Sequence, residues 1–358
     1  MAINYSGLGD AQLDNLETDK ALQSFRAALE SFGSEPNGRE DHDSTLARLY
    51  WHLGRALTES SSQADAISII HKSIAVAEAV AESAPSVNNR RALFVTYELM
   101  VAPLTGREIL NTSDAKAAEF YAGKALVIAE ALASGDRNNM QAHNDLGFGY
   151  QGMGDALRLT RPAIAERWYR KSISIAKEMA PRYPTGSLFQ EVLADREEAL
   201  AAVLARRGQA LEPLKLLQDA NGIWKEVRLA STGKVESRLS LMRTSCRLAE
   251  AELAVNDLAT ARQYADSSLP FFNEFKPDSN SLLVLRDLGL CYESLGNVQR
   301  RIGLDHSLSS LARRAAKSSA HDWYTKSAGV WTEWNRRGAA TPESEVERHK
   351  VERLLQAK

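Results

Sequence analysis

Glycines spaced as in a phosphate-binding loop are the first residues whose pattern suggests chemistry. The run Gly147-Phe-Gly-Tyr-Gln-Gly152 matches G-x-G-x-x-G, in which backbone amides approach phosphate groups closely. Such a loop needs a strand before it, whereas this run lies between Asn144 and Asp155 in a segment with helical periodicity. The kinase signatures His-Arg-Asp and Asp-Phe-Gly do not occur in the sequence. We therefore interpret these glycines as close-packing residues of a helix.

Metal-ligand and nucleophile patterns are equally weak. The run Arg39-Glu-Asp-His-Asp43 has metal-binding residue types, but adjacent residues seldom point at one ion, so a solvated turn before a helix is the better interpretation. The histidines form no H-E-x-x-H pair. Cys246 and Cys291 lie on separate predicted helices, and we expect two buried small side chains. The sequence thus predicts no catalytic residue, no metal and no cofactor, and we expect no enzyme activity in this chain.

A basic stretch is a further candidate binding element. Segment 296–317 has a net charge of +4, from one carboxylate, Asp305, and five cations: Arg300, Arg301, Arg313, Arg314 and Lys317. One interpretation is a binding element for an acidic peptide or a phosphate. The alternative is a solvated insertion with cations near helix ends.

The elements that must position these residues repeat along the chain. A tyrosine, a large apolar residue three positions later and then a glycine occur at four places: Tyr5–Leu8–Gly9, Tyr50–Leu53–Gly54, Tyr150–Met153–Gly154 and Tyr292–Leu295–Gly296. About twelve residues after the glycine, small and larger residues follow at i, i+4 and i+7, as in Ala66, Ile70 and Ser73. That spacing marks one face of a helix, and repetition with a period of tens of residues indicates a solenoid of helical hairpins.

The pattern predicts about seven hairpins and no strands. First helices are expected near 2–16, 44–59, 90–110, 140–159, 187–207, 237–255 and 281–302. Second helices are expected near 19–32, 63–83, 114–134, 162–180, 209–229, 258–274 and 318–336. Pro213 is expected to interrupt the fifth of these. A terminal helix near 342–356 would begin with Thr341 as N-cap and Pro342 at its first position. The predicted domains are a repeat array over 1–340 and a capping helix over 341–358.

Composition narrows the class of protein. The chain has 358 residues, 44% of them apolar and 25% charged, and a net charge of −2. This is ordinary for a folded protein and gives no overall attraction to nucleic acid or to anionic membranes. We expect no nucleic-acid partner, no membrane insertion by this chain and no signal peptide. Because the first motif begins at Tyr5, we expect the chain to be a piece of a longer protein.

The motifs together resemble the tetratricopeptide repeat. The resemblance is carried by Tyr50, Leu53, Gly54, Ala66, Ile70 and Pro85, and again by Tyr150, Met153, Gly154, Ala165, Tyr169 and Pro184. It implies an all-α, right-handed superhelix. The spacing departs from the 34-residue tetratricopeptide period, since Ala28 to Ser73 is 45 residues.

The chain resembles one variety of this family more closely. Elongated repeats closing on Ala320, Tyr324, Ser327, Trp331 and Arg337-Gly338 look like the C-terminal repeat regions of bacterial serine/threonine protein kinases. The implied protein is a signalling protein with its kinase domain upstream. It would be cytoplasmic, or the extracytoplasmic domain of a membrane-anchored kinase.

The resemblance also implies where a partner binds. In tetratricopeptide arrays the first helices line a concave groove, and positions −6, −3, +1 and +4 from the motif glycine face inward. Carrying these positions over gives the predicted groove: Arg48, Trp51, Arg55, Arg107, Gln151, Asp155, Arg158, Arg243, Glu250, Glu293, Asn297 and Arg300. The predicted function is a non-catalytic scaffold that binds a protein or peptide in this groove. The alternative is the regulatory region of a kinase that binds a small molecule inside the superhelix.

Overall fold

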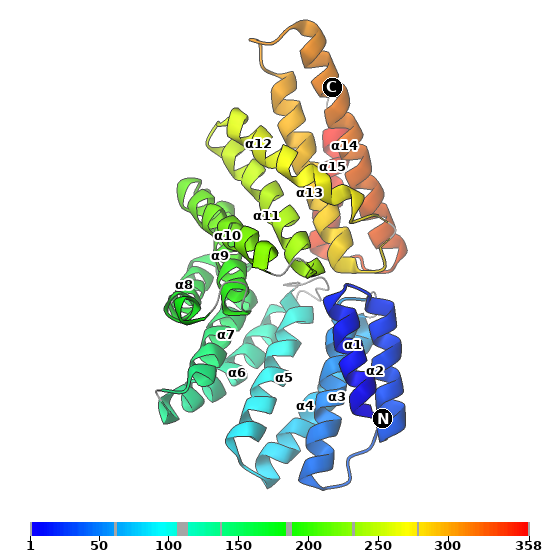
Figure 1. Cartoon of the computed structure of the whole chain (residues 1–358), viewed down its shortest axis with the longest axis vertical. Helices are drawn as coiled ribbons and strands as arrows, with labels where there is room; N and C mark the ends of the chain where they lie inside the picture. The colour runs from blue at the N-terminus through cyan, green and yellow to red at the C-terminus, as the bar shows by residue number, and fades with distance from the viewer. Residues whose placement is uncertain are drawn as a thin grey trace. The chain divides into compact units, whose positions relative to one another are not determined.

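The chain is built from helical hairpins. The computed structural model describes residues 2–60, 63–105, 114–136, 138–183, 188–230, 233–277 and 279–356. Within these ranges the regular elements are fifteen α-helices and two short 3₁₀-helices, and consecutive α-helices pack as hairpins (Figure 1). The predicted fold class, an all-α solenoid of tetratricopeptide-like repeats, is confirmed.

The hairpins form two compact units, 1–182 and 183–358. Unit 1 contains α1 (Ala2–Asp14), α2 (Thr18–Phe32), α3 (Glu40–Thr58), α4 (Gln63–Ser83), α5 (Val87–Thr105), α6 (Ala115–Gly135), α7 (Met140–Leu157), α8 (Pro162–Met179) and η1 (Ala180–Arg182). Unit 2 contains α9 (Leu188–Arg206), α10 (Leu211–Ala230), α11 (Val235–Ala254), α12 (Leu258–Ser268), η2 (Leu269–Asn273), α13 (Leu282–Gly303), α14 (Ser310–Arg336) and α15 (Pro342–Gln356). The division into an array over 1–340 and a cap stays a prediction.

The repeat register is confirmed by burial. The i, i+4, i+7 residues of the second helices are at most 4% exposed in the five hairpins where the sequence pattern is found: Ala21, Phe25, Ala28; Ala66, Ile70, Ser73; Ala118, Ala122, Ala125; Ala165, Tyr169, Ser172; and Ala320, Tyr324, Ser327. Small residues at the outer two positions let each pair of helices approach closely, and burial of the middle side chain removes apolar surface from water.

A hydroxyl at the third position ties the two helices of a hairpin together. The side chains of Ser73, Ser172 and Ser327 donate hydrogen bonds of 2.8, 2.6 and 2.8 Å to backbone carbonyls of the preceding helix. Each acceptor lies seven residues before the motif glycine, at Ala47, Gly147 or Gly289. Because a buried hydroxyl must be hydrogen-bonded, this contact fixes the register of the hairpin as well as adding stability.

The motif glycines face the middle side chain of the second helix. A Cβ on Gly154 would lie 2.9 Å from the Tyr169 ring, and one on Gly54 would lie 2.7 Å from Ile70. The atoms nearest to the added Cβ belong to these larger residues and not to the small Ala66 and Ala165. The larger residue four positions later fills the space that the missing side chain leaves.

Replacement of Gly154 by leucine should therefore destabilise the protein by about 1–3 kcal/mol, because Tyr169 is buried and cannot give way. The matched control is Gly123→Ala in α6, where an added Cβ meets nothing within 4 Å. It should stabilise the helix by up to about 1 kcal/mol. Chemical denaturation of both variants measures the difference. An unchanged midpoint for Gly154→Leu would contradict this packing.

Two helix boundaries and one expected interruption differ most clearly from expectation. α14 begins at Ser310, eight residues before the expected start, so most of the presumed insertion is helical. Pro213 does not interrupt α10, because it occupies the first turn, where a backbone N–H is not needed. The helix expected to reach residue 274 ends at Ser268 and continues as η2, in which Pro270 lies. Thr341 caps α15 as predicted, since its hydroxyl accepts from the Ser344 amide at 3.1 Å.

Among the described residues, no helix is long and apolar enough to cross a bilayer.

Candidate functional site

The first helices of unit 1 are linked side by side. The Asn89 side chain donates to Glu40 at 2.8 Å and joins α5 to α3, and Trp51 Nε1 lies 3.4 Å from the Val95 carbonyl across the same pair. Arg91 Nε lies 2.7 Å from Asp145 and joins α5 to α7. These contacts align α3, α5 and α7 as neighbours, which is the arrangement that a groove along the first helices requires.

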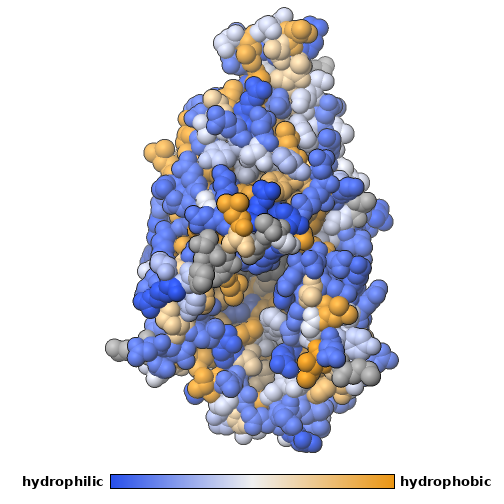
Figure 2. Space-filling view, viewed as in Figure 1, coloured by the Kyte–Doolittle hydropathy of each residue, from blue (hydrophilic) through white to orange (hydrophobic). Residues whose placement is uncertain are grey.

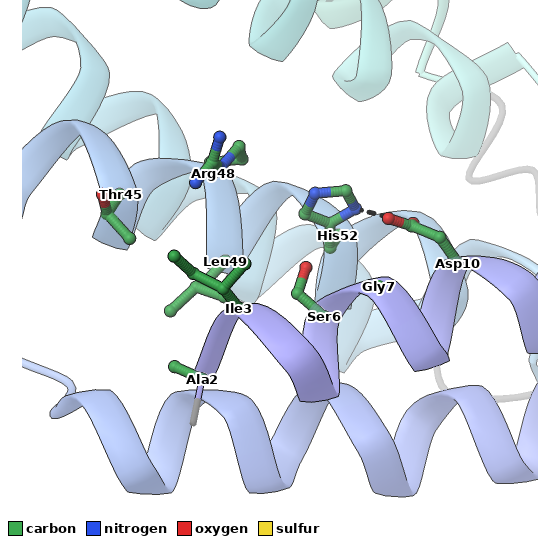
Figure 3. Close-up of a pocket in the computed structure, with 9 residues that line it drawn as sticks. All are labelled: Ala2, Ile3, Ser6, Gly7, Asp10, Thr45, Arg48, Leu49 and His52. Carbon is green, nitrogen blue, oxygen red and sulfur yellow. Dashed lines mark ion pairs between the residues drawn. The ribbon is translucent and has the colours of Figure 1, made fainter.

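A pocket of about 210 Å³ opens between α1 and α3. Figure 3 shows α1 residues on one side and α3 residues on the other, with Ser6 and Asp10 pointing toward His52. The lining consists of Ala2, Ile3, Ser6, Gly7 and Asp10 from α1 and Thr45, Arg48, Leu49 and His52 from α3. Apolar and polar side chains therefore line the same small concavity.

The charges around this pocket are unevenly compensated. His52 Nδ1 lies 2.9 Å from Asp10 Oδ1, and the Arg55 guanidinium lies 3.9 Å from Asp10 and 3.7 Å from Asp14. Burial lowers the pKa of His52, although Asp10 acts in the opposite direction, so this imidazole is neutral at pH 7. Arg48 is exposed and has no ion pair with a described carboxylate. It is thus the cation at the pocket with an uncompensated charge.

Three predicted groove residues lie together on α3. Arg48, Trp51 and Arg55 follow one another at helical spacing, and Trp51 also contacts His52 edge to face at a centroid distance of 5.0 Å. We name Arg48, Trp51, His52 and Arg55 the α3 cluster. Arg107, which we expected beside them, lies outside the described residues.

The predicted groove residues at α7 contact other residues of unit 1. Gln151 and Asp155 are each 3% exposed, and Asp155 accepts a hydrogen bond of 2.5 Å from the Tyr169 hydroxyl. Arg158 donates to the Thr105 carbonyl. These contacts support the packing of unit 1, and a role in partner binding stays a prediction for all three residues.

In unit 2, Arg243 belongs to a buried ionic network. Glu198 of α9, 2% exposed, lies 3.0 Å from Arg243 Nε and 2.7 Å from Arg247 Nη1, both on α11. Thr244 and Trp224 donate to the same carboxylate at 2.8 and 2.9 Å. Burial alone would raise the pKa of Glu198, but the two arginines and the hydrogen bonds lower it to about 2. Arg243 Nη1 also lies 3.4 Å from the buried Asp287 of α13, so this network joins α9, α10, α11 and α13.

The remaining predicted groove residues of unit 2 form a second polar group. Asn297 donates to Glu250 at 2.7 Å and accepts from the Tyr324 hydroxyl at 2.7 Å. Glu293, 3% exposed, lies 2.5 Å from Lys350 of α15. Arg300 is exposed at the end of this group. Their roles in partner binding also stay a prediction.

Glu250 should make stability depend on pH. Burial, aided by the Glu293 charge, raises the pKa of Glu250 to about 7 although Asn297 lowers it. The folded state therefore holds a proton that the unfolded state releases near pH 4.5, and stability falls as pH rises from about 4.5 to about 7. Glu250→Gln, which keeps the acceptor for Asn297, should raise the free energy of unfolding at pH 8 by on the order of 1–2 kcal/mol. Denaturation at pH 5 and pH 8 measures it, and an equal effect at both would contradict the assignment.

The motifs first considered for chemistry take structural roles. Gly149 and Gly152 lie in the middle of α7, where added Cβ atoms would meet Leu126 and Glu98, as the packing interpretation predicts. Asp43 accepts from the Asn37 and Gly38 amides at 2.9 Å each and organises the turn before α3. Cys246 and Cys291 are free and buried, as expected. In the described part of the chain, no group of three or more His, Cys, Asp or Glu side chains is placed to hold a metal.

Sequence reasoning missed Asp10, His52 and the Glu198 network. The glycine spacing places Asp10 at +1, the same offset that predicted Arg55, so the signal for Asp10 was present. His52 lies at −2, outside the inward positions. Glu198 lies 45 and 49 residues before the two arginines with which it pairs. No local pattern reveals that pairing.

No family model matches the sequence, and no curated protein matches it. Solved structures that are similar to this chain include the apo form of RapI, at 8% identity, covering 91% of this chain and 98% of that one, with a TM-score of 0.48. A Rap protein complexed with competence and sporulation factor has 10% identity, coverage of 99% and 98%, and a TM-score of 0.40. Yeast Tom70 has 10% identity, coverage of 99% and 88%, and a TM-score of 0.28. Because every one of these TM-scores is below 0.5, the fold assignment rests on the hairpins themselves.

Proposed function

We propose that the chain is a non-catalytic scaffold that binds an acidic peptide segment along α1 and α3 of unit 1. The observation that carries the proposal is the exposed, uncompensated Arg48 at the edge of a pocket sized for one side chain. Trp51 lies one turn away on the same helix. Arginine and tryptophan are the residue types that most often dominate binding energies, because they offer a planar hydrogen-bonding fork and a large rigid face.

The distribution of charge favours a partner carboxylate at Arg48. The two arginines balance Asp10 and Asp14 in number, but both carboxylates lie beside Arg55, which leaves the Arg48 guanidinium open to the partner. An aspartate or glutamate of the partner would reach Arg48, and a neighbouring apolar side chain would enter the pocket beside Ile3 and Leu49. Polar groups at Ser6 and Thr45 would accommodate the partner's backbone.

The size of this pocket suits a peptide side chain better than a small molecule. At about 210 Å³ it is smaller than the roughly 300–1,000 Å³ typical of metabolite and drug sites. It matches one side chain of an extended segment better than a complete small molecule.

The kinase association stays a proposal. Ala320, Tyr324, Ser327 and Trp331 are buried and pack α14 against α13, so any hairpin of this kind would need such residues. These residues support the assignment of a helical repeat, but they do not favour an association with a kinase. Sequencing the complete reading frame would test the association, and the compartment would follow from the same information.

A random-peptide display selection on the immobilised full chain tests the proposed function. We expect enrichment of segments that combine aspartate or glutamate with one bulky apolar residue. The enrichment should be stronger at 50 mM than at 500 mM salt, because salt screens exposed charges. Enrichment of basic segments, or of none, would contradict the proposal.

A further inference from the structure

The hairpin of α13 and α14 is longer than the others. In α2, α4, α6, α8 and α12, the first small residue of the packing pattern is the fourth residue of the helix, as Ala165 is in α8. In α14 the equivalent residue, Ala320, follows a start at Ser310, which adds seven residues. Seven residues are two helical turns, or about 10 Å. Figure 1 shows this end of α13 and α14 extending past α12 at the upper end of unit 2.

The extension is a built element rather than a loose loop. Gly303 lets α14 approach closely, since an added Cβ would lie 2.7 Å from the Lys317 side chain. Asp305 accepts from the Ser307 amide and hydroxyl at 2.9 and 2.7 Å. The Ser309 hydroxyl accepts from the Ala312 amide at 3.2 Å and caps α14.

Its outer end is unusually apolar. Leu304, Leu308 and Leu311 are 53%, 37% and 77% exposed, whereas a solvated turn normally carries small polar residues. Figure 2 shows apolar surface beside hydrophilic surface at this upper end. These leucines lie at an exposed tip, away from any packed face. Transfer of their side chains from water to an apolar environment would be favourable.

Cations flank the tip on both helices, within about two helical turns. Arg301 precedes Leu304 by three residues, and Arg313, Arg314 and Lys317 follow Leu311 on α14. None of these four cations forms an ion pair with a described carboxylate, although Arg301 donates to the Asn256 side chain and Arg313 lies 2.6 Å from the His306 ring. Asp305 is the one carboxylate of the turn, and its hydrogen bonds to Ser307 lower its pKa.

We propose that the α13–α14 tip docks on an anionic phospholipid surface, with the three leucines in the interfacial region and the four cations among the headgroups. A bilayer surface has anionic headgroups on the outside and apolar chains beneath them. The apolar end of the tip would lie below the headgroups, and the cations behind it would lie at headgroup level. A convex tip would offer a protein partner only a small contact area, whereas a lipid surface conforms to it. This is docking on a membrane surface, without a helix that crosses it.

Co-sedimentation of the full chain with vesicles tests the proposal. We expect binding to phosphatidylcholine–phosphatidylglycerol vesicles (70:30) and little binding to pure phosphatidylcholine. Arg313→Ala with Arg314→Ala should lower the partition coefficient about tenfold or more, since each cation near the surface contributes roughly a fivefold change. Leu308→Gln with Leu311→Gln should lower it as well.

Leu211→Gln with Leu229→Gln is the matched control, because these leucines of α10 are 77% and 80% exposed. It should leave binding unchanged. Circular dichroism and the melting temperature establish that each variant is folded. The proposal is overturned if folded wild-type chain does not bind the anionic vesicles at low salt, or if the tip variants bind as well as the control. Binding of poly-glutamate at the tip without vesicle binding would overturn it in favour of an acidic protein partner.

Discussion

Replacing Glu198 by alanine is expected to cost about 3–5 kcal/mol of stability, the largest effect of any single substitution we consider. Glu198 is buried, and its removal leaves the guanidinium groups of Arg243 and Arg247 without their shared carboxylate. It also removes the acceptor for Thr244 and Trp224. For a unit of this size the melting temperature should fall by roughly 6–20 °C.

The matched control is Glu226→Ala on α10, an exposed glutamate, for which we expect a change within about 0.5 kcal/mol. The pH dependence provides a second criterion. Because the pKa of Glu198 is lowered to about 2, its stabilisation is complete above about pH 4.5 and is lost as pH falls toward 2. The difference between wild type and Glu198→Ala should shrink over that range. A constant difference would show that the carboxylate charge is not what holds the network.

The second large effect concerns binding. For a peptide obtained by selection, Trp51→Ala should raise the Kd by roughly 30-fold or more, since truncation of a central aromatic anchor typically costs at least ~2 kcal/mol. Trp51 also packs toward α5, so the variant must be shown to be folded. Arg48→Glu leaves that packing intact and should weaken the same peptide by reversing the charge that attracts it.

Arg26→Glu in α2 is the control for Arg48→Glu. Arg26 is likewise exposed, and it lies on a second helix of the same unit. It should change affinity little, while the Arg48 variant should also slow association and lose its salt dependence. Equal effects of the two substitutions would mean that only net charge matters and that the α3 cluster is not the binding surface.

The sequence predicts the hairpins well because their signals are local. Periodic small residues, motif glycines and turn prolines act over one or two helices, and the expected boundaries of α4 and α15 match the structure. The predicted start of α14 is later than the observed one, because the two added turns contain none of the repeat's packing residues. The inward positions implied by the tetratricopeptide resemblance also selected Arg48, Trp51 and Arg55, which lie together on α3.

The remainder of the candidate site depends on contacts between distant segments. Burial of Gln151 and Asp155 follows from the packing of α7 in unit 1, where Tyr169 takes the Asp155 carboxylate as its partner. Glu198, which a sequence pattern would assign to the surface, is buried because arginines two helices later approach it. Helical spacing specifies a face, but it does not specify which charged residues on that face find partners inside the protein.

Hydrogen–deuterium exchange of the full chain with and without a selected acidic peptide tests the proposed function most directly. We predict slower exchange of backbone amides in α1 and α3, residues 2–14 and 40–58, and no such change for the Arg48→Glu variant at the same peptide concentration. Slower exchange confined to helices of unit 2, with α1 and α3 unchanged, would contradict it.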